Sequence, residues 1–324
     1  MTATAGWNTR PAGSALAGER RSAVDNGPVP LQIIVPFYGD PRLLRRTVAS
    51  VLDQSDPAWT LTVVDDGYPD STIAAWFAGL TDARVRYRRN ERSLGANGNY
   101  RRCLALADED WLVILGADDE LLADYVATIR AATAAHPTAA VVQPGVQVID
   151  SDGTVVRPLL DRIKSRLRPA GTAVLSGSEL ATSLLRGNWL YFPALAFRRE
   201  PAQRIGFRSG LDVVQDLALV LDLVADGGSL VVLDTVCFSY RRHPASDSSG
   251  RALDGTRFDE QRRFFRQAAD QADALGWSRA ARVGRRHLLS RAHALSLLPA
   301  AVRARRWRGV STLSRHVIGR SAAA

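Results

Sequence analysis

Two adjacent aspartates, Asp118 and Asp119, have the clearest chemical meaning in this chain of 324 residues. They follow the apolar run Trp111–Leu115, which predicts a buried β-strand. Two carboxylates buried together repel each other, and a hard divalent cation with oxygen ligands removes that cost. Such a cation usually arrives with substrate phosphates, so the pair predicts Mg²⁺ or Mn²⁺ carrying a nucleoside diphosphate. The alternative is structural: Asp119 caps a helix that begins at Glu120.

Other polar residues also stand directly after predicted strands. Tyr38 follows Leu31–Phe37, and Asp65 and Asp66 follow Thr60–Val64. An acidic residue at such a position can accept hydrogen bonds from a base or ribose, and a tyrosine can stack on a nucleobase. The alternatives are an ordinary Asp-Gly turn and simple aromatic packing.

A separate carboxylate, Asp216, stands at the start of an apolar helix predicted over Gln215–Ala225. Partial desolvation there would raise the pKa of Asp216 and suit it to act as a general base. The alternative is an acid favoured by the dipole at a helix N-terminus. The sequence leaves both interpretations open.

The elements that position these residues alternate between strand and helix. The predicted strands of the first half are Leu31–Phe37, Thr60–Val64, Arg84–Arg88 and Trp111–Leu115, and the predicted helices are Pro41–Ser55, Ser71–Leu80 and Tyr100–Ala107, the last after a polar turn at Gly95–Asn99. This alternation predicts a mainly parallel sheet, with ligands beyond the carboxyl ends of its strands.

The pattern changes past residue 137. A turn at Asp150–Gly153 predicts a hairpin. The predicted strands are Ala139–Val148, Thr154–Val156, Ala194–Phe197, Leu230–Leu233 and Val236–Tyr240, and the predicted helices are Ser178–Leu185, Gln215–Ala225 and the basic segment from Phe258 onward.

Composition excludes several classes of protein. With 46% hydrophobic and 23% charged residues, the chain is an ordinary globular protein. Its two cysteines, Cys103 and Cys237, lie in apolar stretches, which excludes a disulfide scaffold and favours the cytoplasm. The sequence has no clustered His/Cys set for structural zinc. Residues 1–30 lack the apolar core of a signal peptide and predict a disordered leader, and no run has the roughly 18 apolar residues of a membrane span.

The net charge of +9 belongs to the C-terminal tail. From Gly276 onward there are 11 arginines and no acidic residue, which leaves 31 basic and 33 acidic residues before it. The tail combines arginines with apolar residues at near-helical spacing: Val302, Trp307, Val310, Leu313 and Val317. Such a basic amphipathic helix suits an anionic membrane surface, at the inner face of the cell membrane. The alternative is a helix packed on the body with a solvated basic face.

The ordered series of motifs resembles family 2 glycosyltransferases with the GT-A fold. The stretches that carry the resemblance are VPFYGDP, VVDDG, Gly95–Arg102 and WLVILGADDEL, then GFRSGLDVVQDLALVLDL and FSYRRH, within about Leu31 to Ser249. The resemblance implies a Rossmann-like α/β domain with a mainly parallel central sheet. Residues 31–136 would bind the nucleotide sugar, residues 137–250 would bind the acceptor and carry catalysis, and residues 251–324 would form a basic helical extension.

The resemblance also implies roles for individual residues. Those that match the family's nucleotide-sugar site are Pro36, Tyr38, Asp65, Asp66, Asn99, Arg102 and Asp118. Asp118 matches the metal-binding aspartate of the D-x-D element, with Asp119 as its neighbour, and His243 lies where the family often places a residue near the diphosphate. Asp216 matches the catalytic base.

Two positions depart from the family pattern. Gly116 replaces the first acid of D-x-D, and Gln215 replaces the glutamate of the usual Glu-Asp pair. The second change keeps the aspartate. The first leaves metal ligation to Asp118 and its neighbour.

The implied reaction moves a sugar from a nucleoside diphosphate sugar to an acceptor hydroxyl with inversion. Asp216 takes the hydroxyl proton, and a divalent cation, Mn²⁺ or Mg²⁺, neutralises the departing diphosphate. This activity would serve polysaccharide, cell-envelope glycan or glycoconjugate biosynthesis on a glycan or lipid-linked acceptor, with no nucleic acid as partner. The alternatives are a non-catalytic nucleotide-sugar-binding relative and a nucleic-acid-binding protein that uses the arginine-rich tail. A nucleotidyltransferase would need a glycine-rich basic loop after the first strand, which VPFYGDP lacks.

Overall fold

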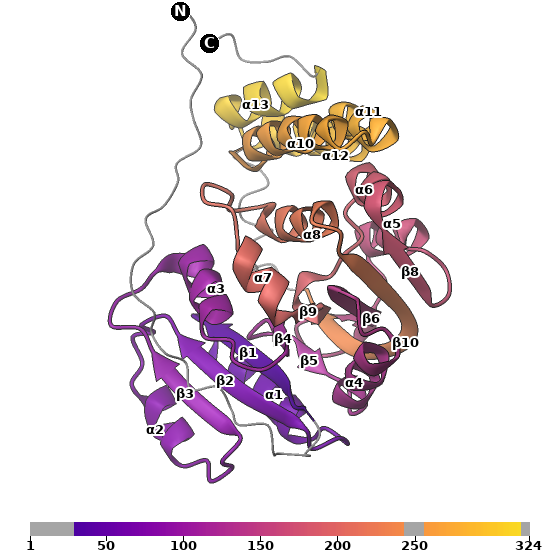
Figure 1. Ribbon diagram of the computed structural model, residues 1–324. Helices are drawn as coiled ribbons and strands as arrows, with labels where there is room; N and C mark the ends of the chain where they lie inside the picture. The colour runs from indigo at the N-terminus through magenta and orange to yellow at the C-terminus, as the bar shows by residue number, and fades with distance from the viewer. Residues whose placement is uncertain (1–28, 243–255, 319–324) are drawn as a thin grey trace, which may run out of the picture.

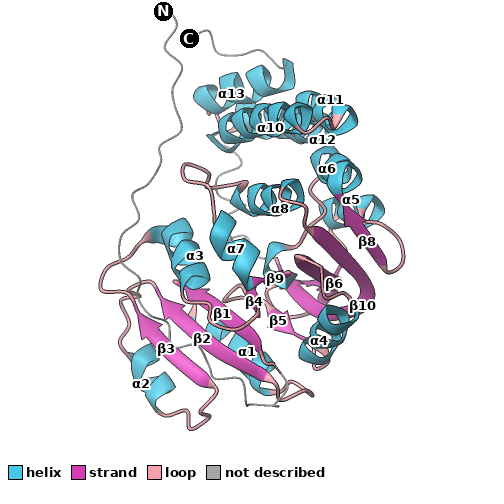
Figure 2. Ribbon diagram, viewed as in Figure 1, coloured by secondary structure: helices cyan, strands magenta, loops and turns pink. Residues whose placement is uncertain are grey.

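The computed structural model describes residues 29–242 and 256–318, and Figure 1 shows their arrangement. One mixed sheet runs through the molecule in the order β3-β2-β1-β4-β9-β6-β10-β5. Helices flank this sheet, and four further helices are stacked together at one end (Figure 2). The predicted leader lies outside the described residues apart from Val29 and Pro30, and His243 lies outside them as well.

The first four strands form the parallel part of the sheet. They are β1 (Leu31–Phe37), β2 (Trp59–Asp65), β3 (Val85–Arg89) and β4 (Trp111–Ile114). β1 pairs in parallel with both β2 and β4, and β2 pairs in parallel with β3. Ile33, Ile34 and Val35 of β1 are fully buried although their side chains alternate between faces. A continuous apolar run is typical of a parallel strand covered on both sides, which is why sequence alone located it.

The helices of this half are α1 (Pro41–Leu52), α2 (Thr72–Ala78), α3 (Gly95–Ala105) and α4 (Tyr125–Ala135). Asp40 caps α1 by accepting a hydrogen bond from Arg42 N at 2.8 Å. The prediction that Gly95–Asn99 is a turn before a helix at Tyr100 was wrong, because α3 already begins at Gly95. The amides of Leu94 and Gly95 donate to Asp66, so a tertiary contact stabilises this helix start.

The second half adds antiparallel pairings to the sheet. Its strands are β5 (Glu120–Leu121), β6 (Val141–Ile149), β7 (Val155–Val156), β8 (Ala173–Ser176), β9 (Ala196–Arg198) and β10 (Ser229–Arg241). β6 and β7 form the predicted hairpin. β9 pairs antiparallel with both β4 and β6, so it joins the two halves into one sheet. The predicted α/β class with a mainly parallel sheet is confirmed.

The two predicted strands Leu230–Leu233 and Val236–Tyr240 are one strand, β10, with a bulge between Val232 and Val236. The bulge presses on Gly145 of β6, where a Cβ atom would lie 2.7 Å from Asp234 O. The sequence showed an interruption but not that pairing continues past it.

The remaining helices of the body are α5 (Leu159–Leu167), α6 (Gly177–Arg186), α7 (Arg199–Ile205) and α8 (Gln215–Ala225), with a short 3₁₀ turn at Phe192–Ala194. α8 is buried over most of its length, as its apolar sequence predicted. The elements that were not predicted from the sequence are α4, α5, α7, β5 and β8.

The C-terminal extension is helical, as predicted, and consists of α10 (Thr256–Ala274), α11 (Ser278–Arg286), α12 (Leu288–Arg303) and α13 (Trp307–Ile318). α10 and α11 contribute Phe264 and Ala281 to the main core, and a smaller core forms around Phe258 and Leu313. The predicted amphipathic segment through Val317 is divided between two helices at Arg305, whose φ is 52°. In the described ranges no helix combines the length and hydropathy that crossing a bilayer requires.

Candidate functional site

The carboxyl ends of β1, β2, β3 and β4 meet at one edge of the sheet because these strands run parallel. Tyr38, Asp66, Asn90 and Gly116 follow these strands along that edge. Backbone bonds keep the ends close together: Asp66 N donates to Phe37 O at 2.9 Å. The structure therefore places the predicted strand-end residues on one side of the sheet, where ligands of such folds bind.

Asp65 is fully buried and serves the sheet itself. Its carboxylate accepts hydrogen bonds from Tyr68 N at 2.7 Å, from Arg89 at 3.0 Å and from the hydroxyl of Tyr87. Burial, followed by the bond to Asp65, raises the pKa of Tyr87 to about 12. The Asp65 side chain offers no surface to a ligand, so any contribution that it makes to nucleotide binding passes through its three partners.

Asp66 holds the loop that leads into α3. Its carboxylate accepts from Asn90 Nδ2 at 2.8 Å, Ser93 Oγ at 2.7 Å, Leu94 N at 2.8 Å and Gly95 N at 2.9 Å. Both oxygens are engaged, and 2% of the residue is exposed. Asp66 therefore holds the loop beside the predicted nucleotide site while remaining buried itself.

Asn99 belongs to the same network. Its Nδ2 donates to Val64 O at 2.9 Å, and its Oδ1 accepts from Asn90 Nδ2 at 3.1 Å. The residue is buried, so it links β2, the β3–α3 loop and α3.

Other predicted nucleotide-site residues remain accessible. Tyr38 is 60% exposed and meets Tyr68 edge-on at 5.7 Å between ring centroids. Arg102 is exposed on α3, and Pro36 is half-buried in β1. An accessible aromatic ring and a guanidinium are groups that a base and a phosphate can contact.

The carboxylates of Asp118 and Asp119 lie close to Gly116, just after β4. A Cβ atom at Gly116 would lie 2.5 Å from Asp119 Oδ2 and 3.1 Å from Asp118 Oδ1. Asp119 is buried, whereas Asp118 is half-buried. The interpretation of Asp119 as the cap of a helix at Glu120 was wrong, because Glu120 begins the short strand β5.

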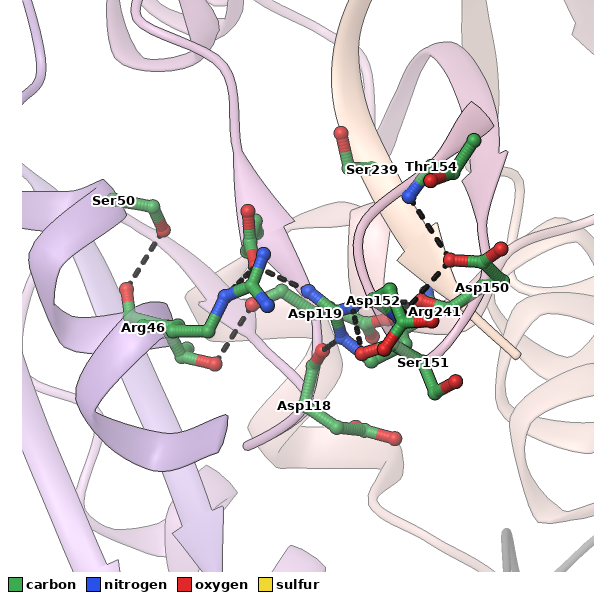
Figure 3. Close-up of polar contacts among 12 residues, drawn as sticks. Arg46, Ser50, Asp118, Asp119, Asp150, Ser151, Asp152, Thr154, Ser239 and Arg241 are labelled. Carbon is green, nitrogen blue, oxygen red and sulfur yellow. Dashed lines mark hydrogen bonds and ion pairs between the residues drawn. The ribbon is translucent and has the colours of Figure 1, made fainter. Parts of the chain in front are cut away.

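Arg241 fixes the backbone around this aspartate pair, as Figure 3 shows. Its side chain is fully buried, with Nε donating to Asp118 O at 2.8 Å and Nη1 donating to Asp150 O at 2.7 Å. Nη2 forms an ion pair with Glu120, and the backbone N of Arg241 donates to Asp119 Oδ1 at 2.8 Å. The arginine ties the end of β10 to the loop after β4.

The pKa of Asp119 is raised well above its ordinary value, first by burial and then by the negative charge of Asp118. Hydrogen bonding from Arg241 opposes this shift without cancelling it. A divalent cation would relieve the same repulsion. The two carboxylates can supply oxygen ligands to a cation whose other ligands would be phosphate oxygens and water. Residues 29–242 and 256–318 contain no group of three His, Cys, Asp or Glu residues that could hold a metal.

Asp216 lies in the first turn of α8 and is half-buried. Burial raises the pKa of this carboxyl, while a hydrogen bond from the backbone of Leu217 and the charge of Lys164 oppose the rise. The position of Asp216 at a helix start is confirmed, and its role as a general base stays a prediction.

Tyr100 of α3 and Tyr240 of β10 lie within electrostatic range of the aspartate pair. Burial raises the pKa of both hydroxyls, and the charges of Asp118 and Asp119 raise them further.

Two further contacts involve neighbours of these tyrosines. On α3, burial and then the charge of Asp66 raise the pKa of Cys103, one turn from Tyr100. On the side of Tyr240, the guanidinium carbon of Arg242 lies 5.4 Å from the Tyr240 ring centroid. Arg242 also acts electrostatically on Lys164, whose charge interacts with Asp216. These pairwise interactions run from α3 through β10 to α5 and α8.

A surface hollow of about 700 Å³ lies elsewhere, between the loop before α8 and α10. Arg208, Leu211, Arg263 and Gln271 are among its lining residues. It contains none of Asp66, Asp118 and Asp216, so it has no part in the candidate site.

Comparison with known families identifies the family to which this chain belongs. The model of the family described as "Glycosyl transferase family 2" matches residues 32–195, which is half of the chain. This chain belongs to glycosyl transferase family 2.

Relatives of this family 2 chain include proteins named for glycan synthesis. It is 27% identical to "Uncharacterized protein MT1568" of Mycobacterium tuberculosis, over 73% of this chain and 75% of that protein. It is 28% identical to "Succinoglycan biosynthesis protein ExoO" of Rhizobium meliloti, over 72% of this chain and 66% of that one. Over 94 residues, 29% of this chain and 37% of the relative, it is 30% identical to "UDP-Glc:alpha-D-GlcNAc-diphosphoundecaprenol beta-1,3-glucosyltransferase WfgD" of Escherichia coli.

Solved structures show the same fold. The family 2 chain superposes on S. aureus TarS 1–349, crystallised in complex with UDP-GlcNAc, with a TM-score of 0.58. The superposition covers 91% of this chain and 93% of that one at 14% identity. At this level of identity the likeness establishes the fold alone, and it extends past residue 195, where the family match ends.

Several residues near the candidate carboxylates were not predicted from the sequence. Four of them interact with the carboxylates or with one another: Tyr100, Lys164, Tyr240 and Arg242. Arg241 holds the loop after β4. The apolar or basic sequence around these residues does not indicate such contacts, and the available signal was the position of YRRH after a predicted strand.

Proposed function

We propose that this family 2 glycosyltransferase moves a sugar, such as a hexose, from a nucleoside diphosphate sugar to an acceptor hydroxyl with inversion at the anomeric carbon. The observation that carries the proposal is Asp216, a half-buried carboxylate with a raised pKa in the first turn of α8, in a chain that belongs to this family. Direct displacement requires such a base and, separately, an element that binds the diphosphate.

Asp216 acts as the general base. The acceptor oxygen attacks the anomeric carbon as its proton passes to the Asp216 carboxylate, and the bond from that carbon to the diphosphate oxygen breaks. The desolvation that raises the pKa of Asp216 makes it a stronger base than an exposed aspartate. Correct placement of such a base contributes about 10²–10⁴ in rate.

The nucleotide end of the donor meets the edge formed by β1, β2 and α3. Tyr38 stacks on the base, Arg102 reaches a phosphate, and the network of Asp66 and Asn99 holds the loop that encloses them. The accessibility of Tyr38 and Arg102 supports this assignment. The complexes of TarS with UDP-GlcNAc and with UDP support a nucleotide-sugar donor.

Asp118 and Asp119 would hold a divalent cation, Mn²⁺ or Mg²⁺. When bound, this cation supplies positive charge for the diphosphate. The support is the convergence of the two carboxylates over Gly116 and the raised pKa of Asp119, which marks repulsion that a cation would relieve. Arg241 holds both residues in position by donating to the carbonyl oxygen of Asp118 and to the carboxylate of Asp119.

The acceptor is a glycan or a lipid-linked sugar of envelope or exopolysaccharide synthesis. The support is the names of the relatives ExoO and WfgD, the first for succinoglycan biosynthesis and the second for transfer to a diphosphoundecaprenol-linked sugar.

The outer face of the C-terminal helices fits an anionic membrane that carries such an acceptor. Leu288, Leu295 and Val302 recur every seven residues on α12 and are 64%, 55% and 46% exposed. Trp307 is 66% exposed, and four exposed arginines are adjacent to it: Arg303, Arg305, Arg306 and Arg308. Apolar side chains beside arginines favour binding to acidic lipid headgroups, at the inner face of the cell membrane.

The rest of the predicted amphipathic segment packs inward. Leu313 is fully buried, and Val310 and Val317 pack against the same small core. The two interpretations of the tail therefore concern different faces, because Trp307 is exposed at the start of α13, whereas Val310, Leu313 and Val317 of the same helix pack on the small core. Sedimentation with vesicles of acidic lipid tests the outer face: the double substitution L295S/W307S should weaken binding about tenfold or more, whereas neutral vesicles should bind neither protein.

The decisive experiment for transfer is a screen of nucleotide sugars for release of nucleoside diphosphate in the presence of Mn²⁺. Asp216→Asn should lower turnover by about 10²–10⁴ while leaving the affinity for the donor unchanged. Asp226→Asn is the matched control, because Asp226 ends the same helix on the surface, in an ion pair with Arg204. Full turnover in the Asp216→Asn protein would reject Asp216 as the base, whereas no turnover of any donor by the unsubstituted protein would favour a non-catalytic relative.

A further inference from the structure

The segment that leads from α7 into α8 is held by side chains from another part of the chain. It runs from Gly206 to Val214, and two of its glycines have positive φ, 69° at Gly206 and 74° at Gly210. Val214 is the N-cap of α8, and its side chain has no oxygen that could accept from the first amides of the helix. Because Asp216 is the second residue of α8, the position of its carboxylate depends on what fixes this segment.

Glu260 of α10 supplies the acceptor that Val214 lacks. Its Oε1 accepts hydrogen bonds from Val213 N at 2.6 Å and from Val214 N at 3.0 Å. In a capping box, a glutamate or glutamine at the third helical position accepts from the N-cap amide, but α8 has Leu217 there. The acceptor for the N-cap amide of α8 therefore comes from a residue 46 positions further along the chain.

The surroundings of Glu260 favour a firm contact. The residue is buried, with 8% exposed. Hydrogen bonds from backbone amides to a carboxylate are stronger than those between neutral groups, and a negative charge is favoured at a helix N-terminus. One turn further along α10, Phe264 belongs to the same buried core as Val214 and Leu217. Packing and hydrogen bonding thus join the start of α8 to α10 of the C-terminal extension (Figure 1).

Helix α10 also holds α8 at a second place. Arg208 Nη2 donates to Gln271 Oε1 at 2.9 Å, and Gln271 Nε2 donates to Asp222 Oδ1 at 3.2 Å. Asp222 lies toward the C-terminal end of α8. Glu260 is therefore the contact next to Asp216, and Gln271 is the contact at the other end of the helix.

We propose that Glu260 is a positioning residue of the transfer reaction, which from the C-terminal extension fixes the start of α8 and so places the Asp216 carboxylate. The inference rests on the proposed function for its catalytic meaning, whereas the contact of Glu260 with the two amides is independent of it. The proposal gives the extension a part in catalysis in addition to the membrane binding proposed for its outer face.

The kinetic test separates the reach of the side chain from its charge. Glu260→Ala should lower kcat about 10²-fold, the loss that a displacement of about 1 Å can cause, and leave the affinity for the donor unchanged. Glu260→Gln keeps an acceptor oxygen at the same reach and should keep most of the turnover, although it carries no charge. Glu260→Asp keeps the charge but is one methylene shorter, so it should lose turnover as the alanine variant does.

Gln271→Ala is the matched control, because it removes the other contact of α10 with α8. A residue that only helps α10 to pack would make the two alanine variants lose turnover alike. If Glu260 positions the base, Gln271→Ala should keep its turnover. Equal losses in Glu260→Ala and Gln271→Ala would therefore overturn the positioning role.

A second test needs no turnover. Hydrogen exchange of the full-length protein reports directly on the amides of Val213 and Val214. In Glu260→Ala and Glu260→Asp their exchange should accelerate about tenfold or more, the effect expected from losing a hydrogen bond to a charged group. In Glu260→Gln it should stay near that of the unsubstituted protein.

Exchange at Val213 and Val214 that ignores these substitutions would overturn the contact, and Glu260→Asp makes this comparison even if Glu260→Ala fails to fold. Faster exchange with an unchanged kcat would overturn the positioning role. The same holds for a kcat that is kept by Glu260→Asp and lost by Glu260→Gln. If exchange responds as expected but the unsubstituted protein turns over no donor, the contact stands and the proposed glycosyl transfer fails.

Discussion

The molecule contains two Asp-Asp pairs at strand ends on one edge of the sheet, the first at the end of β2 and the second after β4, with β1 between these strands. Asp65, the last residue of β2, and Asp66 receive donors from β3, the following loop and the start of α3. Asp118 and Asp119 after β4 lie close to a glycine, and the pKa of Asp119 is raised by burial and by its neighbour. The first pair holds a loop through many donors of the protein, and the second is the pair for which we propose a cation.

The difference comes from what surrounds each dipeptide. After β2 the chain supplies a tyrosine hydroxyl, side-chain amides, a serine hydroxyl and free amides at a helix N-terminus. After β4, Arg241 binds mainly the carbonyl oxygens of the loop and the carboxylate of Glu120. The same dipeptide thus holds a loop where many donors surround it, and we propose that it binds a cation where burial and the neighbouring charge raise the pKa of Asp119.

The largest effect should separate the pairs by activity. Asp118→Asn removes a half-buried carboxylate from the proposed cation site, and we expect turnover to fall about 10²–10³-fold with little change in the free energy of unfolding. Steady-state kinetics and urea unfolding measure the two quantities. Normal turnover of Asp118→Asn would contradict the proposed role of the Asp118–Asp119 pair in the reaction.

The next effect should separate them by stability. Asp66→Ala leaves the buried donors of Asn90, Ser93, Leu94 and Gly95 without their carboxylate, which should lower the free energy of unfolding by about 3 kcal/mol. Urea unfolding compares this variant with Asp118→Ala, for which we expect a change below about 1 kcal/mol. Equal losses in the two variants would contradict the division between scaffold and site.

A smaller effect should come from the glycine beneath the second pair. In Gly116→Ala the new Cβ atom would lie 2.5 Å from Asp119 Oδ2, so we expect a loss of about 1–3 kcal/mol from overpacking. Gly39→Ala is the matched control, because nothing lies within 4 Å of its Cβ position. Adding Asp119→Ala should recover part of the loss. Equal stability of the two alanine variants would show that the carboxylates do not need the glycine.

The Gly116 geometry also explains a departure from the family pattern. The acid expected at that position would collide with Asp119, so the chain has either the first acid or the inward Asp119. The sequence showed that the acid was missing. Only the coordinates show that a neighbouring carboxylate occupies its place.

The positions of the strand ends were predicted correctly from the sequence. Strand ends in a parallel sheet meet at one edge, and Tyr38, Asp66 and Asp118 follow such ends in the structure. The roles of these residues stay predictions. The engagement of Asp65 and Asp66 by internal donors was not foreseeable, because those donors come from up to 29 residues away. The apolar helix from Gln215 was predicted and is α8, and the role of Asp216 as the base stays a prediction.

The sequence by itself determined the strands with continuous apolar runs, the residues that follow them and, through the order of its motifs, the family. These are local properties, since a strand covered on both faces needs apolar side chains at every position. Only the tertiary structure decided that α3 begins at Gly95, that β10 continues through its bulge, and that Arg241 binds the loop after β4. Each of these depends on a hydrogen bond, close packing or charge from a distant segment, and such partners are set by how the chain folds back on itself.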